Sequence, residues 1–150
     1  MSELRELYQS VILDHNKKPR NTGEPEGANR SAEGNNPLCG DRLTVHLAVE
    51  DGAVRDVGFV GQGCAISTAS ASIMTEAIKG RPVEEVERLF ESFHDLVTSD
   101  PTSDVDTSHF GKLAVFAGVR EFPMRVKCAT LCWHTMHSAL EGVDEPVTTE

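Results

Sequence analysis

The sequence predicts an α+β domain in which a small three-stranded antiparallel sheet is packed on one side by helices. Residues 43–63, "LTVHLAVEDGAVRDVGFVGQG", alternate apolar and polar residues on both sides of Asp51–Gly52, which is typical of a hairpin with a tight turn. The segments before and after this hairpin carry apolar residues at helical spacing instead. The later helical segments follow one another without intervening strands, which favours helices segregated on one side of the sheet.

The elements are expected in the following order. The spacing of Leu4, Leu7, Tyr8, Val11 and Ile12 predicts an amphipathic helix ending near Asp14. Residues 16–37 are polar and rich in Gly, Pro and Asn, so they are expected to form an ordered loop. The hairpin comes next, and a third short strand is expected to join it.

Helices are expected over residues 65–80, 83–97, 111–119 and 126–141, with Gly80 closing the first, Pro82 opening the second and Pro123 breaking the chain before the last. Residues 1–141 are predicted to form the domain and residues 142–150 a flexible tail.

Composition narrows the class of protein. A chain of 150 residues is long enough for one domain with its own core. The net charge of −10 argues against a nucleic-acid partner, and no apolar run reaches the length that crosses a membrane. The N-terminus lacks the apolar stretch of a signal peptide, so a cytoplasmic protein is expected, with its four cysteines as thiols or metal ligands.

The acidic residues are concentrated between Val83 and Thr107, where eight carboxylates accompany Arg88 alone. A solvated helix face and loop is the favoured interpretation, and a docking site for a basic partner is the alternative.

Three cysteines fall where predicted elements meet: Cys39 before the hairpin, Cys64 after it and Cys128 at the start of the last helix. Together with Asp41 they supply four donors, the number that a tetrahedral zinc site requires. Gly40 between Cys39 and Asp41 permits a tight turn that directs two donors inward. The spacing alone leaves scattered, partly buried thiols as an equal alternative, because it matches no local metal motif.

Four motifs favour a joint metal site over scattered thiols. "LYQSVILDHNKKPRN", "NPLCGD", "GQGCAIS" and "RVKCATLCW" together resemble the iron–sulfur cluster scaffold family, and specifically its SufU branch, from the first helix to about Glu141. The resemblance implies an α+β fold, zinc ligands at Cys39, Asp41, Cys64 and Cys128, and a PLP-dependent cysteine desulfurase of the SufS type as partner. Scaffolds of the IscU type carry histidine where this chain has Lys127, and a shorter interval between Cys64 and Cys128.

The expected function is therefore a zinc-dependent sulfurtransferase that accepts persulfide sulfur and relays it toward iron–sulfur cluster assembly proteins. The resemblance and the mobility expected of a glycine-containing turn both assign sulfur acceptance to Cys39. Arg125 and Lys127 are expected either to offset the negative charge of the site or to be ordinary cations at a helix start. A scaffold that binds iron or a nascent cluster is the alternative, and a purely structural zinc domain is a third possibility.

The remaining candidates are expected to have no chemical role. Cys132 lies one turn beyond Cys128 and is expected to be a core thiol. His134 and His137 are expected to be surface or core histidines, and His15 to contact a partner or to cap the first helix. Trp133 and Phe122 are expected in the core.

Overall fold

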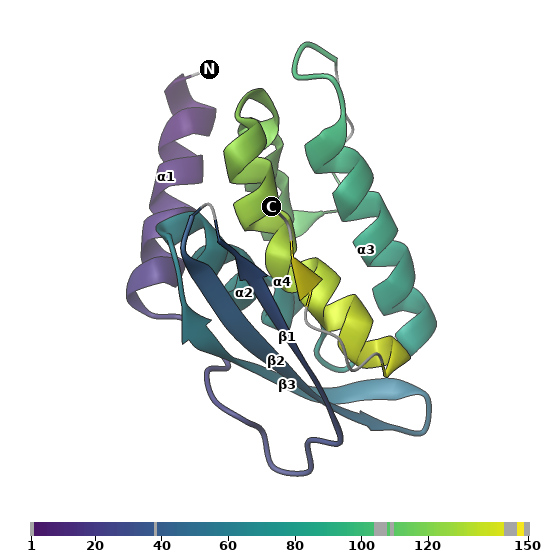
Figure 1. The fold of residues 1–150 in the computed structure, drawn as a ribbon. Helices are drawn as coiled ribbons and strands as arrows, with labels where there is room; N and C mark the ends of the chain where they lie inside the picture. Colours follow the sequence, from purple (N-terminus) through teal and green to yellow (C-terminus); the bar gives the residue numbers. More distant parts are fainter. Residues whose placement is uncertain (1, 38, 104–107, 109, 143–146, 149–150) are drawn as a thin grey trace.

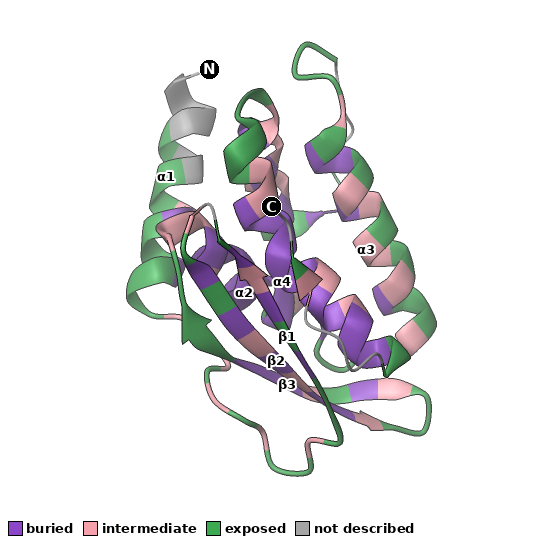
Figure 2. Cartoon of the chain, in the orientation of Figure 1, coloured by how far each residue is buried: buried purple, intermediate pink, exposed green. Residues whose placement is uncertain are grey.

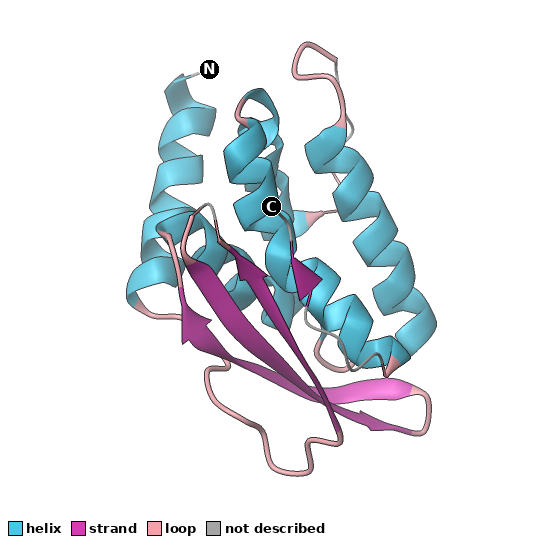
Figure 3. Ribbon diagram, in the orientation of Figure 1, coloured by secondary structure: helices cyan, strands magenta, loops and turns pink. Residues whose placement is uncertain are grey.

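The structure is a computed structural model that describes residues 2–37, 39–103, 108, 110–142 and 147–148. Its elements in chain order are α1 (Ser2–Lys17), β1 (Arg30–Asn36), β2 (Asp41–Glu50), β3 (Ala53–Gln62), α2 (Ala65–Ile78), α3 (Val83–Thr98), the 3₁₀ helix η1 (Gly111–Glu121), α4 (Pro123–Glu141) and β4 (Val147–Thr148). The helices gather on one side of the sheet (Figures 1 and 3), which confirms the predicted α+β class.

The sheet has the strand order β3-β2-β1-β4. Strands β1, β2 and β3 pair antiparallel, and the β2–β3 turn places Asp51 and Gly52 in the left-handed region, as the predicted tight turn requires. β4 pairs parallel to β1, with Val147 opposite Gly34. The sheet is therefore four-stranded and mixed, whereas the sequence predicted three antiparallel strands. The boundary between a domain and a flexible tail near residue 142 stays a prediction.

The third strand comes from a segment that was expected to be a loop, so that expectation was wrong for Arg30–Asn36. Ala32, Gly34 and Asn36 are buried in alternation with more exposed neighbours, but they are small or polar and give no apolar signal. A Cβ atom at Gly34 would collide with Thr135 Oγ1 of α4. Glycine at this position therefore lets α4 pack directly against β1.

Two helix boundaries differ from the prediction. α1 continues to Lys17 instead of ending near Asp14; Val11 and Ile12 pack on the core, and the side chains of Leu4, Leu7 and Tyr8 lie outside the described part. α4 begins at Pro123, a residue suited to the first helical position because that position needs no N–H bond. Cys128 consequently lies in the second turn of α4 rather than at its start.

α4 is the central helix of the fold. It packs against β1, β2, α2, α3 and η1, and Figure 2 shows it buried along most of its length. Trp133 is fully buried and stacks on Phe93 of α3, with ring centroids 4.7 Å apart, as expected of a core residue. Phe122 was expected in the core but is 43% exposed, because it lies at the exposed junction of η1 and α4. None of the described helices is long and apolar enough to cross a membrane.

Candidate metal centre

Four segments bring the predicted donors to one end of the sheet. Cys39 lies in the short turn between β1 and β2, and Asp41 is the first residue of β2. Gly40 between them has φ +71°, a left-handed conformation that favours glycine, as predicted from the Cys-Gly-Asp sequence. Cys64 immediately precedes α2, and Cys128 projects from α4.

Three of these donors converge closely. The ligand atoms of Cys39, Asp41 and Cys128 all lie within 4.8 Å of one another. The Cys128 thiol donates to Cys39 Sγ at an S···S distance of 3.3 Å. Zn–S bonds of about 2.3 Å give a tetrahedral S···S edge of roughly 3.8 Å, so the two sulfurs are already near the spacing of a shared ion.

Cys64 joins the group through Asp41. Its backbone N–H donates to Asp41 Oδ1 at 2.8 Å, and its Sγ lies 3.8 Å from Asp41 Oδ2. A Cβ atom at Gly63 would lie 2.6 Å from Asp41 Oδ1, so the close approach of this backbone to the carboxylate requires glycine. Cys64 is also the N-cap of α2, since its Sγ accepts the N–H of Ser67 at 3.4 Å.

The centre is partly closed to solvent. Asp41 and Cys128 are buried, whereas Cys39 and Cys64 are half-buried. Burial, followed by hydrogen bonds to Cys39 and Asp41, raises the pKa of the Cys128 thiol well above its ordinary value. A cation among these donors would oppose that effect by stabilising the thiolate.

Three cysteine sulfurs and one carboxylate form a donor set that fits Zn²⁺, which prefers four tetrahedral ligands of this kind. The residues that would hold it are Cys39, Asp41, Cys64 and Cys128. The same soft donors also accept iron, so the donor set by itself does not separate the two metals.

The two cationic residues before Cys128, Arg125 and Lys127, lie in different surroundings. The Arg125 guanidinium lies 4.3 Å above the Phe122 ring, a cation–π contact on the exposed first turn of α4. Lys127 is half-buried in the turn that leads to Cys128. Stacking explains where Arg125 lies, while a charge-balancing role for either residue stays a prediction.

Cys132 lies outside this donor group. It is fully buried, and its thiol lies 3.4 Å from Ser70 Oγ on α2. Burial raises the pKa of Cys132 to about 12, so the residue is a neutral thiol at physiological pH. The structure thus places the two cysteines of α4 in different environments one turn apart.

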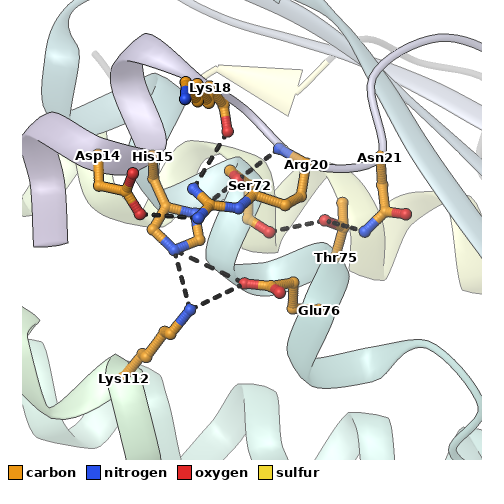
Figure 4. A network of polar contacts seen from close by, with 9 residues as sticks. All are labelled: Asp14, His15, Lys18, Arg20, Asn21, Ser72, Thr75, Glu76 and Lys112. Carbon is orange, nitrogen blue, oxygen red and sulfur yellow. Dashed lines mark hydrogen bonds and ion pairs between the residues drawn. The ribbon is translucent and has the colours of Figure 1, made fainter.

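His15 lies in the last turn of α1 with its side chain in the interior, and a contact with a partner or a capping role stays a prediction. It is fully buried, and Nδ1 forms a hydrogen bond of 2.7 Å with Ser72 Oγ, which also accepts the backbone N–H of Arg20 (Figure 4). Nε2 lies 3.6 Å from Glu76 and 3.4 Å from Lys112. The residue therefore joins α1, α2 and η1.

His134 and His137 are half-buried and pack against Phe90 of α3, with ring centroids 5.3 and 4.9 Å from it. Both were expected to be surface or core histidines.

The sequence interpretation missed Asn36. This residue ends β1, is fully buried, and directs Nδ2 toward Cys128 Sγ at 4.0 Å. The available signal was its place in "NPLCGD", three positions before Cys39, but an asparagine before proline is also an ordinary turn residue.

Comparison with known proteins identifies the family of this chain. Residues 7–129 match the family described as "NifU-like N terminal domain". The chain is 39% identical over 139 residues to the "Zinc-dependent sulfurtransferase SufU" of Bacillus subtilis, which covers 93% of this chain and 92% of that protein. It is 36% identical over 140 residues to the "Iron-sulfur cluster assembly scaffold protein IscU" of Thermotoga maritima, with 93% and 96% covered.

A solved structure shows the same fold. The crystal structure of a putative iron–sulfur cluster assembly scaffold protein for the SUF system from Fervidobacterium islandicum superposes with a TM-score of 0.80 at 33% identity. It covers 90% of this chain and 97% of that chain. The chain therefore belongs to the family of NifU-like N-terminal domains, as a member of the IscU and SufU type.

Proposed function

We propose that this protein is a zinc-dependent sulfurtransferase that accepts persulfide sulfur from a PLP-dependent cysteine desulfurase of the SufS type. It relays the sulfur to downstream proteins of iron–sulfur cluster assembly. The observation that carries the proposal is the convergence of Cys39, Asp41 and Cys128, with Cys64 beside them, at a partly exposed end of the sheet. The similarity to the Bacillus subtilis protein named a zinc-dependent sulfurtransferase supports the same assignment.

Zinc, when bound, holds the cysteine ligands as thiolates at neutral pH and protects them from oxidation. The Cys39 thiolate then attacks the terminal sulfur of the persulfide on the desulfurase. A new S–S bond forms at Cys39, the S–S bond to the desulfurase cysteine breaks, and that cysteine leaves as a thiolate. The exchange conserves electrons and needs no external oxidant.

Access and mobility favour Cys39 as the attacking residue. Cys39 is half-buried in a turn that contains Gly40, so its side chain can move without displacing a helix or strand. Cys64 caps α2, and Cys128 is buried within α4. Movement of either residue would disturb an element that is packed on the core.

The second candidate function is an assembly scaffold that binds iron or a nascent cluster. It is favoured by the Thermotoga maritima relative, which is named an IscU scaffold protein, and by a donor set that also suits iron. Lys127, where the IscU-type motif has histidine, favours the sulfur carrier instead.

The metal content of protein purified from cells without added metal separates these functions. We expect about one zinc per chain and little iron. A brown, iron-bearing product would support the scaffold and contradict the proposal.

Sulfur acceptance is then tested with a SufS-type desulfurase and free cysteine, with persulfide mapped by mass spectrometry. We expect persulfide on Cys39 in the natural protein and none in Cys39→Ala. Unreactive thiols in a zinc-loaded protein would indicate a structural zinc domain, and persulfide that persists without Cys39 would reject that residue as the acceptor.

A further inference from the structure

Asn36 is a fully buried polar residue that lies beside the candidate metal centre. It is the last residue of β1 and pairs across the sheet with Asp41. Its backbone carbonyl accepts the N–H of Cys39 at 3.2 Å, so it also closes the turn that carries Cys39. One residue therefore contacts the segments of two candidate ligands through its backbone.

The side chain reaches a third ligand. Asn36 is fully buried, Nδ2 lies 4.0 Å from Cys128 Sγ, and Oδ1 has no hydrogen-bond partner among the described residues. Buried amides are ordinarily satisfied at both ends, and an exception needs an explanation. A thiolate accepts hydrogen bonds and donates none, so an N–H directed at Cys128 is the stabilising orientation once that residue is ionised.

The three cysteine ligands differ in the N–H donors that they receive. Cys64 Sγ accepts the backbone N–H of Ser67, and Cys128 Sγ is the acceptor for Asn36 Nδ2. Within the described part of the chain, the donor to Cys39 Sγ is the Cys128 thiol, and no N–H group is directed at it. A hydrogen bond to a thiolate draws charge from sulfur and so lowers its nucleophilicity, as outer contacts of metal ligands generally tune those ligands.

We propose that these N–H donors add to access and mobility in setting the order of thiolate reactivity, and that Asn36 is a positioning residue that helps to keep Cys128 out of sulfur transfer. Asn36 holds the Cys128 sulfur in place and withdraws charge from it, which leaves Cys39 as the reactive thiolate. This inference rests on the proposed function for its purpose. The relative reactivity of the cysteine thiols, however, can be measured without a desulfurase.

The test compares three variants of the full-length, zinc-loaded protein. Asn36→Leu keeps the branched shape but removes the donor and the unpaired Oδ1. Asn36→Asp replaces the amide donor by a carboxylate of nearly the same shape, which also adds a negative charge. Asn35→Leu is the matched control, because Asn35 is the preceding residue of β1, half-buried, with its side chain on the opposite face. Each protein is treated with limiting iodoacetamide, and alkylation of each cysteine is followed by peptide mass mapping.

In the natural protein and in Asn35→Leu we expect Cys39 to be alkylated first and Cys128 last among the three candidate ligand cysteines, with the core thiol Cys132 unreactive. In Asn36→Leu and Asn36→Asp the rate at Cys128 relative to Cys39 should rise by about tenfold, which equals the smaller of the effects that loss of such a contact has on metal affinity or activity. With desulfurase and cysteine, part of the persulfide should move from Cys39 to Cys128. Competition with a chromophoric chelator should show weaker zinc binding.

An unchanged alkylation order in both Asn36 variants would overturn the proposal. If that result came with a lower melting temperature, Asn36 would have a structural role only. Should Asn36→Leu fail to fold, Asn36→Asp alone decides the outcome. Absence of persulfide on every cysteine of the natural protein would reject the proposed function, while the alkylation order would still decide the role of Asn36.

Discussion

Two cysteines on one helix show how the local environment decides what a thiol can do. Cys128 and Cys132 are one turn apart on α4, so the sequence places them on the same side of the helix. Cys128 meets Cys39 and lies in the donor group, whereas Cys132 points to Ser70 of α2 and has no exposed surface. The first is a candidate ligand and the second is a core residue.

The first prediction concerns Cys132→Ala. The substitution removes a contact with Ser70 and leaves a small cavity, so the free energy of unfolding should fall by about 1 kcal/mol. Zinc content and persulfide on Cys39 should both be unchanged, because the residue belongs to neither process. Elemental analysis and mass mapping check these expectations, with Cys128→Ala as the control that should lose zinc. Zinc loss in Cys132→Ala itself would show that the ligand set includes this residue.

At the scale of elements, the contact of α4 with β1 positions Cys128 relative to the turn that carries Cys39. Gly34 lies at the centre of this contact, where a Cβ atom would meet both Thr135 and Leu131 of α4. Thr135 Oγ1 is already committed to the Leu131 carbonyl at 2.7 Å, so it cannot easily turn away. The absence of one side chain thus sets the distance between a helix and a strand.

The second prediction follows for Gly34→Ala. Overpacking at this site should lower the free energy of unfolding by about 1–3 kcal/mol, measured by urea denaturation. Adding Thr135→Ala should recover part of that loss, because it removes the atom that a new Cβ meets first. Thr135→Ala alone serves as the control. Equal stability of Gly34→Ala and the natural protein would contradict the close packing of α4 on β1.

A second junction of elements is buried around His15. Desolvation, followed by the positive charges of Arg20 and Lys112, lowers the pKa of His15, and Glu76 and Asp14 oppose this effect. His15 is therefore more easily protonated in the unfolded chain than in the folded one. The contribution of His15 to the free energy of unfolding is fully present above its ordinary pKa of about 6.5 and is lost as the pH falls below that value.

The third prediction is the pH dependence that results. His15→Gln should lower the free energy of unfolding at pH 8 by about 1 kcal/mol, because the hydrogen bond to Ser72 is weakened. Between pH 7.5 and pH 5.5 the free energy of unfolding should fall less in this variant than in the natural protein, because the variant lacks a histidine whose pKa is lowered by folding. Urea denaturation at several pH values measures both effects.

His134→Gln is the comparison for this experiment. The pKa of His134 is also lowered, by burial and then by His94 and His137, so its variant should reduce the same pH dependence without breaking the bond to Ser72. The residues of the candidate metal centre are the same in all three proteins, so their contribution to the pH dependence cancels in the differences. If the free energy of unfolding depended on pH in both variants as it does in the natural protein, the assigned pKa directions would be contradicted.

At the scale of the whole molecule, the parts that the sequence predicted are those with regular apolar spacing. The hairpin around Asp51–Gly52 and the later helices follow from period and turn chemistry. β1 was missed because its inward residues are small or polar, and β4 because two residues carry no pattern. Local propensity cannot detect strands that exist only through their partners.

The candidate centre was predictable in a different way. Spacing did not distinguish a joint site from scattered thiols, and the resemblance of four motifs supplied the ligand set. The convergence of Cys39, Asp41 and Cys128 agrees with it. The donor from Asn36 and the burial of His15 depend on contacts between residues 92 and 57 positions apart, which no local pattern records.

The proposed ligands connect most of the fold. Cys39 and Asp41 belong to the β1–β2 turn and the start of β2, Cys64 to the start of α2, and Cys128 to the central helix. An ion held by all four would link the sheet to two helices that are distant in the sequence. Because such a site does not exist in the unfolded chain, the free energy of metal binding adds to the free energy of unfolding.

The fourth prediction is that zinc removal destabilises the entire domain. At free zinc 1,000-fold above Kd, binding adds about 4 kcal/mol to the free energy of unfolding. For a chain of this length that corresponds to a fall in Tm of roughly 10 °C on removal. Calorimetry before and after verified chelation measures the change, and added zinc should restore it. Asp41→Ala should show a low Tm that zinc restores poorly, whereas Cys132→Ala should respond as the natural protein does. A melting curve unaffected by complete zinc removal would exclude a metal centre that joins these elements.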